Sequence, residues 1–154
     1  MTLRRKRNDF VGYEHRAARN RANNPLHTKA ASFVDALQGR SDVALSEFML
    51  VELYEVLRSP GFGVRPLGPL QATEICTELR RHPRWQIFGA PPDSVAFHDA
   101  FWPMLAAPAF ARRRAYDWRM ALSLIQQGVD EFATINTKDF EGFGFRRVWN
   151  PLVG

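Results

Sequence analysis

The chain has very little cysteine and no long apolar run. Its 154 residues contain a single cysteine, Cys76, which excludes an internal disulfide and fits a reducing compartment. No apolar stretch approaches the roughly 20 residues that span a membrane, and no secretory signal pattern opens the sequence. We therefore expect a cytoplasmic protein with no membrane contact. Ile75 and Leu79 share the helical pattern around Cys76, which predicts a buried core thiol.

Several catalytic motifs are also missing. The four histidines show no close pairing at the spacing of zinc ligands. There is no Ser-His-Asp arrangement, and no glycine-rich loop of the kind that cradles phosphates, because Gly61 and Gly63 belong to a turn cluster. The sequence thus argues against zinc hydrolases, serine hydrolases and P-loop nucleotide-binding proteins.

Positive charge is in excess. Twenty-one Lys and Arg residues oppose 16 Asp and Glu, for a net charge of +5 and a pI near 10.0. Much of the excess lies in Arg4-Arg5-Lys6-Arg7 and Arg112-Arg113-Arg114. A polyanion such as RNA or DNA is the natural partner, and a soluble surface with a basic tail is the alternative. We expect residues 1–8 to be a basic segment, a candidate for disorder, and residues 9–154 to form one domain.

Short strand-like runs alternate with longer helix-like runs. This alternation is typical of an α/β protein whose parallel sheet is covered by helices on both faces. The helix patterns cover residues 25–37, 46–58, 70–81, 94–105 and 115–127, and the strand patterns cover residues 9–13, 43–45, 85–88, 132–135 and 147–149.

Two acids lie on apolar faces of predicted helices. Asp117 precedes Ala121 by one helical turn, and Glu52 lies between Phe48 and Val56 on one line. A buried charge needs a partner, and a metal ion suits several acids at once. Two alternatives stay open: Asp117 could interact with the helix dipole, and Glu52 could pair with an arginine across the core.

Four stretches of this chain resemble PIN-domain nucleases, especially the toxin ribonucleases of VapBC-type toxin–antitoxin pairs. They are Asn24-Pro25-Leu26-His27, the segment 43–57 around Glu52, the segment 116–128 around Asp117, and the segment 132–151. The resemblance covers roughly residues 24 to 151. It implies a three-layer α/β/α fold with a short parallel central sheet, and cleavage of RNA phosphodiesters by a water that Mg²⁺ or Mn²⁺ activates.

The resemblance also implies the site residues. Glu52 and Asp117 match two of the family's acids, and Asn136 and Asp139 both fall in the turn where another ligand stands. Asp9 is the candidate for the first acid. We therefore predict Asp9, Glu52, Asp117 and Asp139 as catalytic residues, and the same four with Asn136 as metal ligands. Asp139 as a simple turn residue is the alternative at that position.

The beginning of the chain departs from the family pattern. Basic residues precede Asp9 where an apolar strand is expected, and Val11 stands where the family has asparagine. The first acid is therefore either Asp9, displaced in a shortened strand, or absent. This departure motivates an alternative function, a catalytically impaired PIN-fold protein that binds RNA or a protein partner without cleavage. A third hypothesis is a basic nucleic-acid-binding protein whose acids are structural.

The predicted partners follow from the same resemblance and from charge. Arg112, Arg113, Arg114 and Arg119 lie near Asp117 in the sequence and are predicted to hold the RNA backbone. The family implies a cognate antitoxin that blocks the acidic site. The apolar segment 97–110 is expected to cover the core or, in part, to form a homodimer contact.

Overall fold

The computed structural model describes residues 9–11, 25–60 and 66–153 of the chain. The side chains of residues 9–11 and 25–27 lie outside the described part. The basic segment predicted for residues 1–8 therefore also lies outside the described residues.

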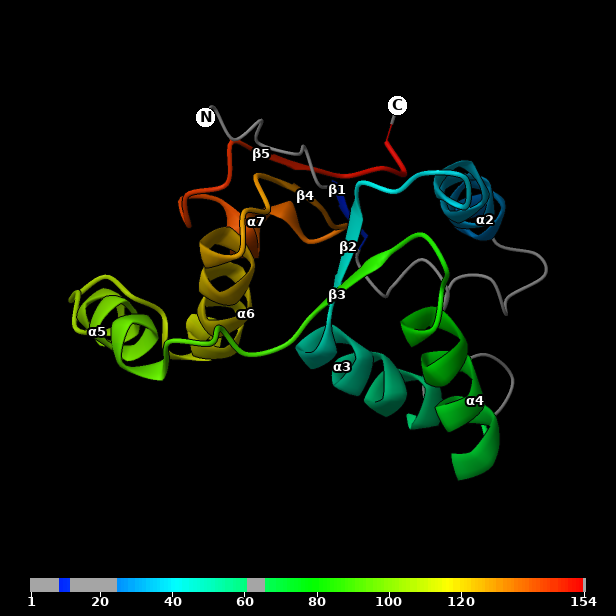
Figure 1. Ribbon diagram of the computed structural model, residues 1–154, viewed down its shortest axis with the longest axis horizontal. Helices are drawn as coiled ribbons and strands as arrows, with labels where there is room; N and C mark the ends of the chain where they lie inside the picture. The colour runs from blue at the N-terminus through cyan, green and yellow to red at the C-terminus, as the bar shows by residue number, and fades with distance from the viewer. Residues whose placement is uncertain (1–8, 12–24, 61–65, 154) are drawn as a thin grey trace.

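Five short strands form one parallel sheet in the order β3-β2-β1-β4-β5 (Figure 1). Their bounds are Asp9–Val11 for β1, Val43–Ser46 for β2, Gln86–Phe88 for β3, Glu131–Ala133 for β4 and Arg147–Trp149 for β5. The most apolar strands occupy the middle of the sheet, where burial is greatest. The prediction of an α/β protein with a short parallel central sheet is confirmed.

The strand register defines the two ends of the sheet. Asp9, which opens β1, is level with Val43 of β2 and with Glu131 of β4, and both of those residues also open their strands. The carboxyl ends lie at the other edge, where β2 ends at Ser46 and β4 ends at Ala133. Sites in parallel sheets form beyond the carboxyl ends, so we refer to that edge as the rim.

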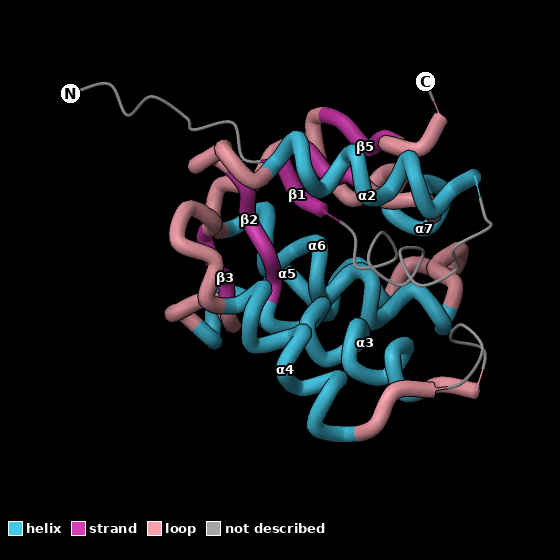
Figure 2. Tube along the Cα trace, turned by 90° about the vertical axis from the view of Figure 1, so that its right-hand side faces the viewer, coloured by secondary structure: helices cyan, strands magenta, loops and turns pink. Residues whose placement is uncertain are grey.

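Helices pack on both sides of the sheet. In Figures 1 and 2, α2 lies on one side of the strands while α5 and α6 lie on the other. The helices are α2 (Pro25–Leu37), α3 (Glu47–Arg58), α4 (Pro69–Arg80), α5 (Ser94–Leu105), α6 (Ala115–Gln126) and the short α7 (Thr137–Phe140), with a 3₁₀ turn η1 at Arg112–Arg114. The five longer helices match the predicted runs within one residue, whereas η1 and α7 were not predicted.

Local signals explain where the helices near the rim begin and end. Ser46 ends β2 and also caps α3, because its Oγ accepts the N–H of Phe48 at 3.1 Å. Helix α3 therefore starts directly on the rim. Gly128 follows α6 with a φ of 90°, a left-handed conformation that glycine adopts without steric cost, and the chain then turns into β4.

The core lies between the sheet and its helices. Phe132, Leu124 and Val43 are among its fully buried side chains. A second cluster joins α3 to α4 through Leu53, Leu57 and Ala72. Cys76 is half-buried rather than fully buried as predicted, and its Sγ lies 3.5 Å from the Leu50 carbonyl oxygen. No helix in the described part of the chain is long and apolar enough to cross a membrane.

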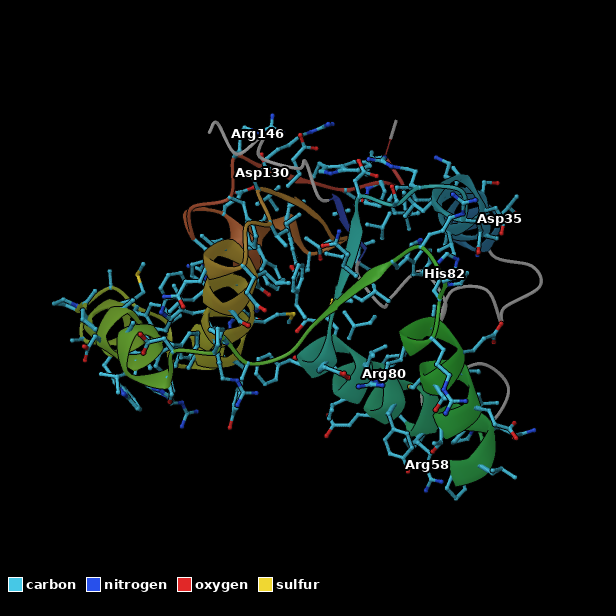
Figure 3. All side chains as sticks on the ribbon, in the orientation of Figure 1. Asp35, Arg58, Arg80, His82, Asp130 and Arg146 are labelled. Carbon is cyan, nitrogen blue, oxygen red and sulfur yellow. The ribbon has the colours of Figure 1, made fainter. Side chains whose placement is uncertain are left out.

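A charged cluster occupies the end of the sheet opposite the rim. Arg146 donates from Nε to the Asp130 carboxylate at 3.0 Å and also pairs with Glu131. Figure 3 shows Asp130 and Arg146 side by side near the start of β4, far from α3. Arg147 lies 4.0 Å from the nearly buried Glu131 carboxylate and stacks over Trp149. Asp130 is therefore an ion-pair partner at the far end of the molecule.

Candidate functional site

One cavity separates α3 from α6 and carries both of the acids on apolar helix faces. Its volume is about 650 Å³, within the range of roughly 300–1,000 Å³ typical of ligand sites. The lining residues come from the two helices alone: Phe48, Val51, Glu52, Glu55, Val56, Tyr116, Asp117 and Arg119. Glu52 and Asp117, 65 residues apart in the sequence, thus open into the same space.

The positions of these acids follow from how the two helices begin. Because Ser46 fixes the start of α3 on the rim, Glu52 lies in the second turn, on the line that Phe48 and Val56 also share. Asp117 lies in the first turn of α6, which follows η1 without a break. Both acids are half-buried, which fits acids that line a cavity.

Asp117 carries an electrostatic strain. Burial raises its pKa above the ordinary value of 3.8, and the nearby Asp139 carboxylate raises it further. Arg114 and Arg113 act in the opposite direction and lower it. Because the Asp139 carboxylate acts on Asp117, α7 brings a further acid near the start of α6; the role of Asp139 as a ligand stays a prediction.

Asp139 is held in place by its own segment. The Asn136 side-chain amide donates to the Asp139 carboxylate, and the Asn136 backbone N–H donates to Thr134 Oγ1 at 3.1 Å. Thr134 is buried directly after β4, where its N–H bonds the Trp149 carbonyl at 2.9 Å. These hydrogen bonds hold Thr134, Asn136 and Asp139 together at the carboxyl end of β4, which is part of the rim.

Arg114 fastens α7 to the beginning of α6. Its guanidinium donates to the Asp139 backbone carbonyl from Nε at 3.0 Å and from Nη2 at 2.8 Å, and Nη2 also donates to the Glu141 carbonyl at 3.0 Å. The guanidinium carbon lies 4.3 Å from the Phe143 ring centroid. Arg114 is thus committed to backbone contacts that set where Asp139 stands, while Arg112 and Arg113 are exposed.

Arg119 lies close to two aromatic rings of the cavity. Its guanidinium carbon lies 4.6 Å from the Phe48 ring centroid and 5.3 Å from that of Tyr116. Its Nε is buried and has no hydrogen-bond partner within the described structure. Although two residues of separation places Arg119 on a different helical face from Asp117, both side chains line the same cavity.

The donor set fits a hard divalent cation held by few protein ligands. Within residues 25–60 and 66–153, no three Asp, Glu, His or Cys side chains gather closely enough to hold one ion by themselves. Mg²⁺ commonly binds through one or two carboxylates and keeps several waters. Burial first, and the Asp139 carboxylate second, raise the pKa of Asp117, and a bound cation would offset both effects. Asp117, Asp139 and Glu52 are therefore suitable donors.

Asp9 starts at a different level. Its backbone is level with Glu131, three residues before Thr134, which corresponds to about 10 Å along a strand. The Asp9 side chain lies outside the described residues, so its role as a ligand stays a prediction.

Two apolar residues of the cavity, Val51 and Tyr116, were not predicted from the sequence. Tyr116 and Val51 are 68% and 60% exposed, and each immediately precedes one of the two acids. The available signal was an apolar residue directly before an acid in each of two helices, at a position that the core pattern does not include.

The metal-free site should become less stable as Asp117 ionises. Because the pKa of Asp117 is raised in the folded state, this penalty is absent below the ordinary value of 3.8, grows above it and is complete once the pH exceeds the raised value. We expect Asp117→Asn to melt at a higher temperature than the parent protein at pH 7.5 in chelator, with the difference shrinking as the pH falls toward 4. Thermal unfolding followed by circular dichroism measures this, and a lower melting temperature for the variant at pH 7.5 would contradict it.

Comparisons with known proteins place this geometry in context. No protein-family model matches the chain. Over 129 residues it is 44% identical to ribonuclease VapC24 of Mycobacterium tuberculosis, in both strain CDC 1551 / Oshkosh and strain H37Rv, and the match covers 84% of this chain and 86% of the relative.

Two solved structures are similar in fold. The M. tuberculosis toxin VapC20, which cleaves the sarcin–ricin loop, has a TM-score of 0.57 at 16% identity, covering 88% of this chain and 95% of that one. FitAB bound to a DNA fragment has a TM-score of 0.54 at 15% identity, covering 94% and 95%.

Proposed function

This chain belongs to the VapC family of PIN-domain ribonucleases, and on that basis we propose that it is a metal-dependent endoribonuclease, the toxin of a toxin–antitoxin pair. The observation that carries the proposal is the shared cavity of Glu52 and Asp117. By the sequence resemblance these two acids correspond to metal-binding positions of the family, and they come from helices that only the fold brings together.

In the proposed reaction, Asp117 with Glu52 or Asp139 would hold Mg²⁺ or Mn²⁺ together with bound waters. Asn136 would orient Asp139 through its amide. When bound, the metal would lower the pKa of a water for attack on phosphorus and offset charge on the phosphate oxygens. Arg114 keeps Asp139 in position through the carbonyls of α7.

The arginines have divided roles in this proposal. The exposed Arg112 and Arg113 would contact the RNA backbone. Arg119 would contact the substrate inside the cavity, where its Nε has no partner within the described structure. Arg114 was predicted to bind RNA as well. Because its Nη2 donates to the backbone carbonyls of Asp139 and Glu141, we propose that it positions α7 and contacts RNA less than Arg112 and Arg113 do.

The proposal includes partners and a location. A cognate antitoxin would bind over the acidic cavity and exclude RNA, both of them in the cytoplasm. A homodimer would use α5, whose Val95 and Trp102 are exposed apolar residues.

A catalytically impaired PIN-fold protein is the second candidate function. Two observations favour it: the register that sets Asp9 at the opposite end of its strand from the rim, and the missing three-carboxylate cluster among the described side chains. Such a protein would bind RNA or a protein partner with the same basic surface and leave the phosphodiester intact.

Removal of the metal tests the proposal directly. We expect the purified protein to cleave single-stranded RNA with Mn²⁺ or Mg²⁺, and cleavage to fall at least about 100-fold in EDTA, because metal activation supplies several kcal/mol of the barrier reduction. Labelled RNA resolved on a denaturing gel gives the rates, and added Mn²⁺ should restore them. Tight RNA binding without cleavage at any Mn²⁺ concentration would instead support the impaired protein.

A further inference from the structure

The cavity between α3 and α6 has two chemically different halves. Glu52, Glu55 and Asp117 supply carboxylates, whereas Phe48, Val51, Val56 and Tyr116 supply an apolar and partly aromatic wall. Val56 also packs against the cluster of Leu53, Leu57 and Ala72, whereas Tyr116 and Val51 are mostly exposed and are free to contact a ligand. An exposed aromatic wall beside a polar reaction site indicates a ligand that is itself part flat and part charged.

The two halves are joined residue by residue. Val51 directly precedes Glu52 on α3, and Tyr116 directly precedes Asp117 on α6. Because both members of each pair line the same cavity, a group lying on the wall can also approach the acids of both helices. In RNA, the base and the phosphate of one nucleotide are separated by a single sugar, so a nucleotide can reach both halves at once.

Arg119 adds a flat, positively charged group with a free hydrogen-bond donor to the apolar wall. Its guanidinium carbon lies 4.6 Å from the Phe48 ring centroid and 5.3 Å from the Tyr116 ring centroid. Its buried Nε has no hydrogen-bond partner in the described part of the chain. A buried N–H that lacks a partner is costly, so the bound ligand should bring an acceptor as well as a flat surface.

We propose that Tyr116, Phe48 and Arg119 form a subsite for one unpaired RNA base next to the scissile phosphate. RNA bases stack on aromatic rings and on arginine planes, and their edges and phosphates accept hydrogen bonds. An apolar peptide helix fits the cavity less well, because it would cover the wall while leaving the Arg119 Nε and the adjacent acids unmatched. The proposal rests on the ribonuclease function and adds to it a position where one unstacked base beside the scissile phosphate is bound.

A comparison of two RNA probes tests the subsite. One probe is a short fluorescein-labelled oligouridylate, and the other has the same length and phosphates but abasic riboses. Both are titrated with the full chain in EDTA, and affinity is read by fluorescence anisotropy. Base–aromatic stacking contributes about 1–3 kcal/mol per base, so we expect the parent protein to bind the oligouridylate about tenfold more tightly.

The variants assign this preference to the wall. Tyr116→Ala should reduce the preference to nearly one, whereas Tyr116→Phe should keep it because the ring remains. Arg119→Lys should weaken it while retaining the charge, because a lysine cannot present a flat surface. Trp102→Ala, which removes an exposed aromatic residue on α5, is the matched control and should leave the preference unchanged.

The outcomes are decisive in either direction. Equal affinity of the parent protein for the two probes, or a preference that survives in Tyr116→Ala, would overturn the base subsite and leave a protein segment as the occupant of the wall. Because the readout is binding in chelator, it is independent of cleavage. A parent protein that prefers the oligouridylate yet never cleaves RNA would keep the subsite and reject the ribonuclease function.

Discussion

Asp117→Asn should lower RNA cleavage at saturating Mn²⁺ by at least about 100-fold, which corresponds to about 2.7 kcal/mol of transition-state stabilisation. The substitution keeps the size of the side chain and removes the charge that a hard cation requires. It also removes the repulsion between Asp117 and Asp139, so the variant should fold at least as well as the parent protein. A large loss of rate without a loss of stability is the signature of a catalytic carboxylate.

Two further aspartates make this result specific. Asp99→Asn changes an exposed aspartate on α5 and should leave the cleavage rate within about twofold, as surface substitutions usually do. Asp9→Asn separates the two readings of the first acid. If Asp9 stays at the level of Glu131, about 10 Å from the rim, its loss should matter little. A loss at Asp9 comparable to that at Asp117 would restore it as a ligand.

If Asp117→Asn cleaved RNA as fast as the parent protein, the metal would have to be held elsewhere and the proposed site would be wrong. Affinity for RNA in EDTA supplies the internal check. It should stay within about threefold of the parent value, because phosphate contacts come from basic side chains that this substitution leaves in place.

The arrangement of helices and strands was predictable because it depends on local signals. The apolar period, the Ser46 cap and the stop at Gly128 are all encoded within a few residues of where they act. The segments η1 and α7 were not predicted, because helices of 3 and 4 residues are too short to show a helical period. The sequence pattern at α7 indicates a turn.

The site was predictable only in part. Glu52 and Asp117 were predictable as site residues because each is an acid on an apolar helix face. The family resemblance then implied their common role as metal ligands. The contacts of Arg114 were not accessible in this way, because its partners are backbone carbonyls 25 and 27 residues further along the chain. Carbonyls carry no residue identity, so the sequence offered only an arginine in a basic run.

The position of Asp9 relative to the neighbouring strands could not be predicted either. The sequence indicated a strand at Asp9 and an acid within it, but a strand pattern does not specify how far the strand slides against its neighbours. Only pairing with Val43 and Glu131 places Asp9 at the starting end of the sheet. The strand register therefore decides whether Asp9 can lie close enough to Glu52 and Asp117 to bind the same metal ion.

The second large effect is expected in the core, at Trp118. This side chain directly follows Asp117, is 5% exposed, donates from Nε1 to the Phe101 carbonyl at 3.1 Å and packs on Phe143. Trp118→Ala should lower the free energy of unfolding by about 3–5 kcal/mol, since it leaves a large cavity and removes the hydrogen bond to the Phe101 carbonyl. Urea unfolding followed by circular dichroism gives the value, and an unchanged m-value would show that the same folded state is being compared.

Trp102 provides the matched control on the neighbouring helix. It is 60% exposed, so Trp102→Ala should change the stability of the monomer by less than about 1 kcal/mol. Equal effects of the two substitutions would mean that Trp118 does not anchor α6 on α5. The difference bears on function because Trp118 fixes the first two turns of α6, which carry Tyr116, Asp117 and Arg119. A chain that loses this anchor should therefore lose cleavage before it unfolds, as α6 drifts from α3 and the two halves of the cavity separate.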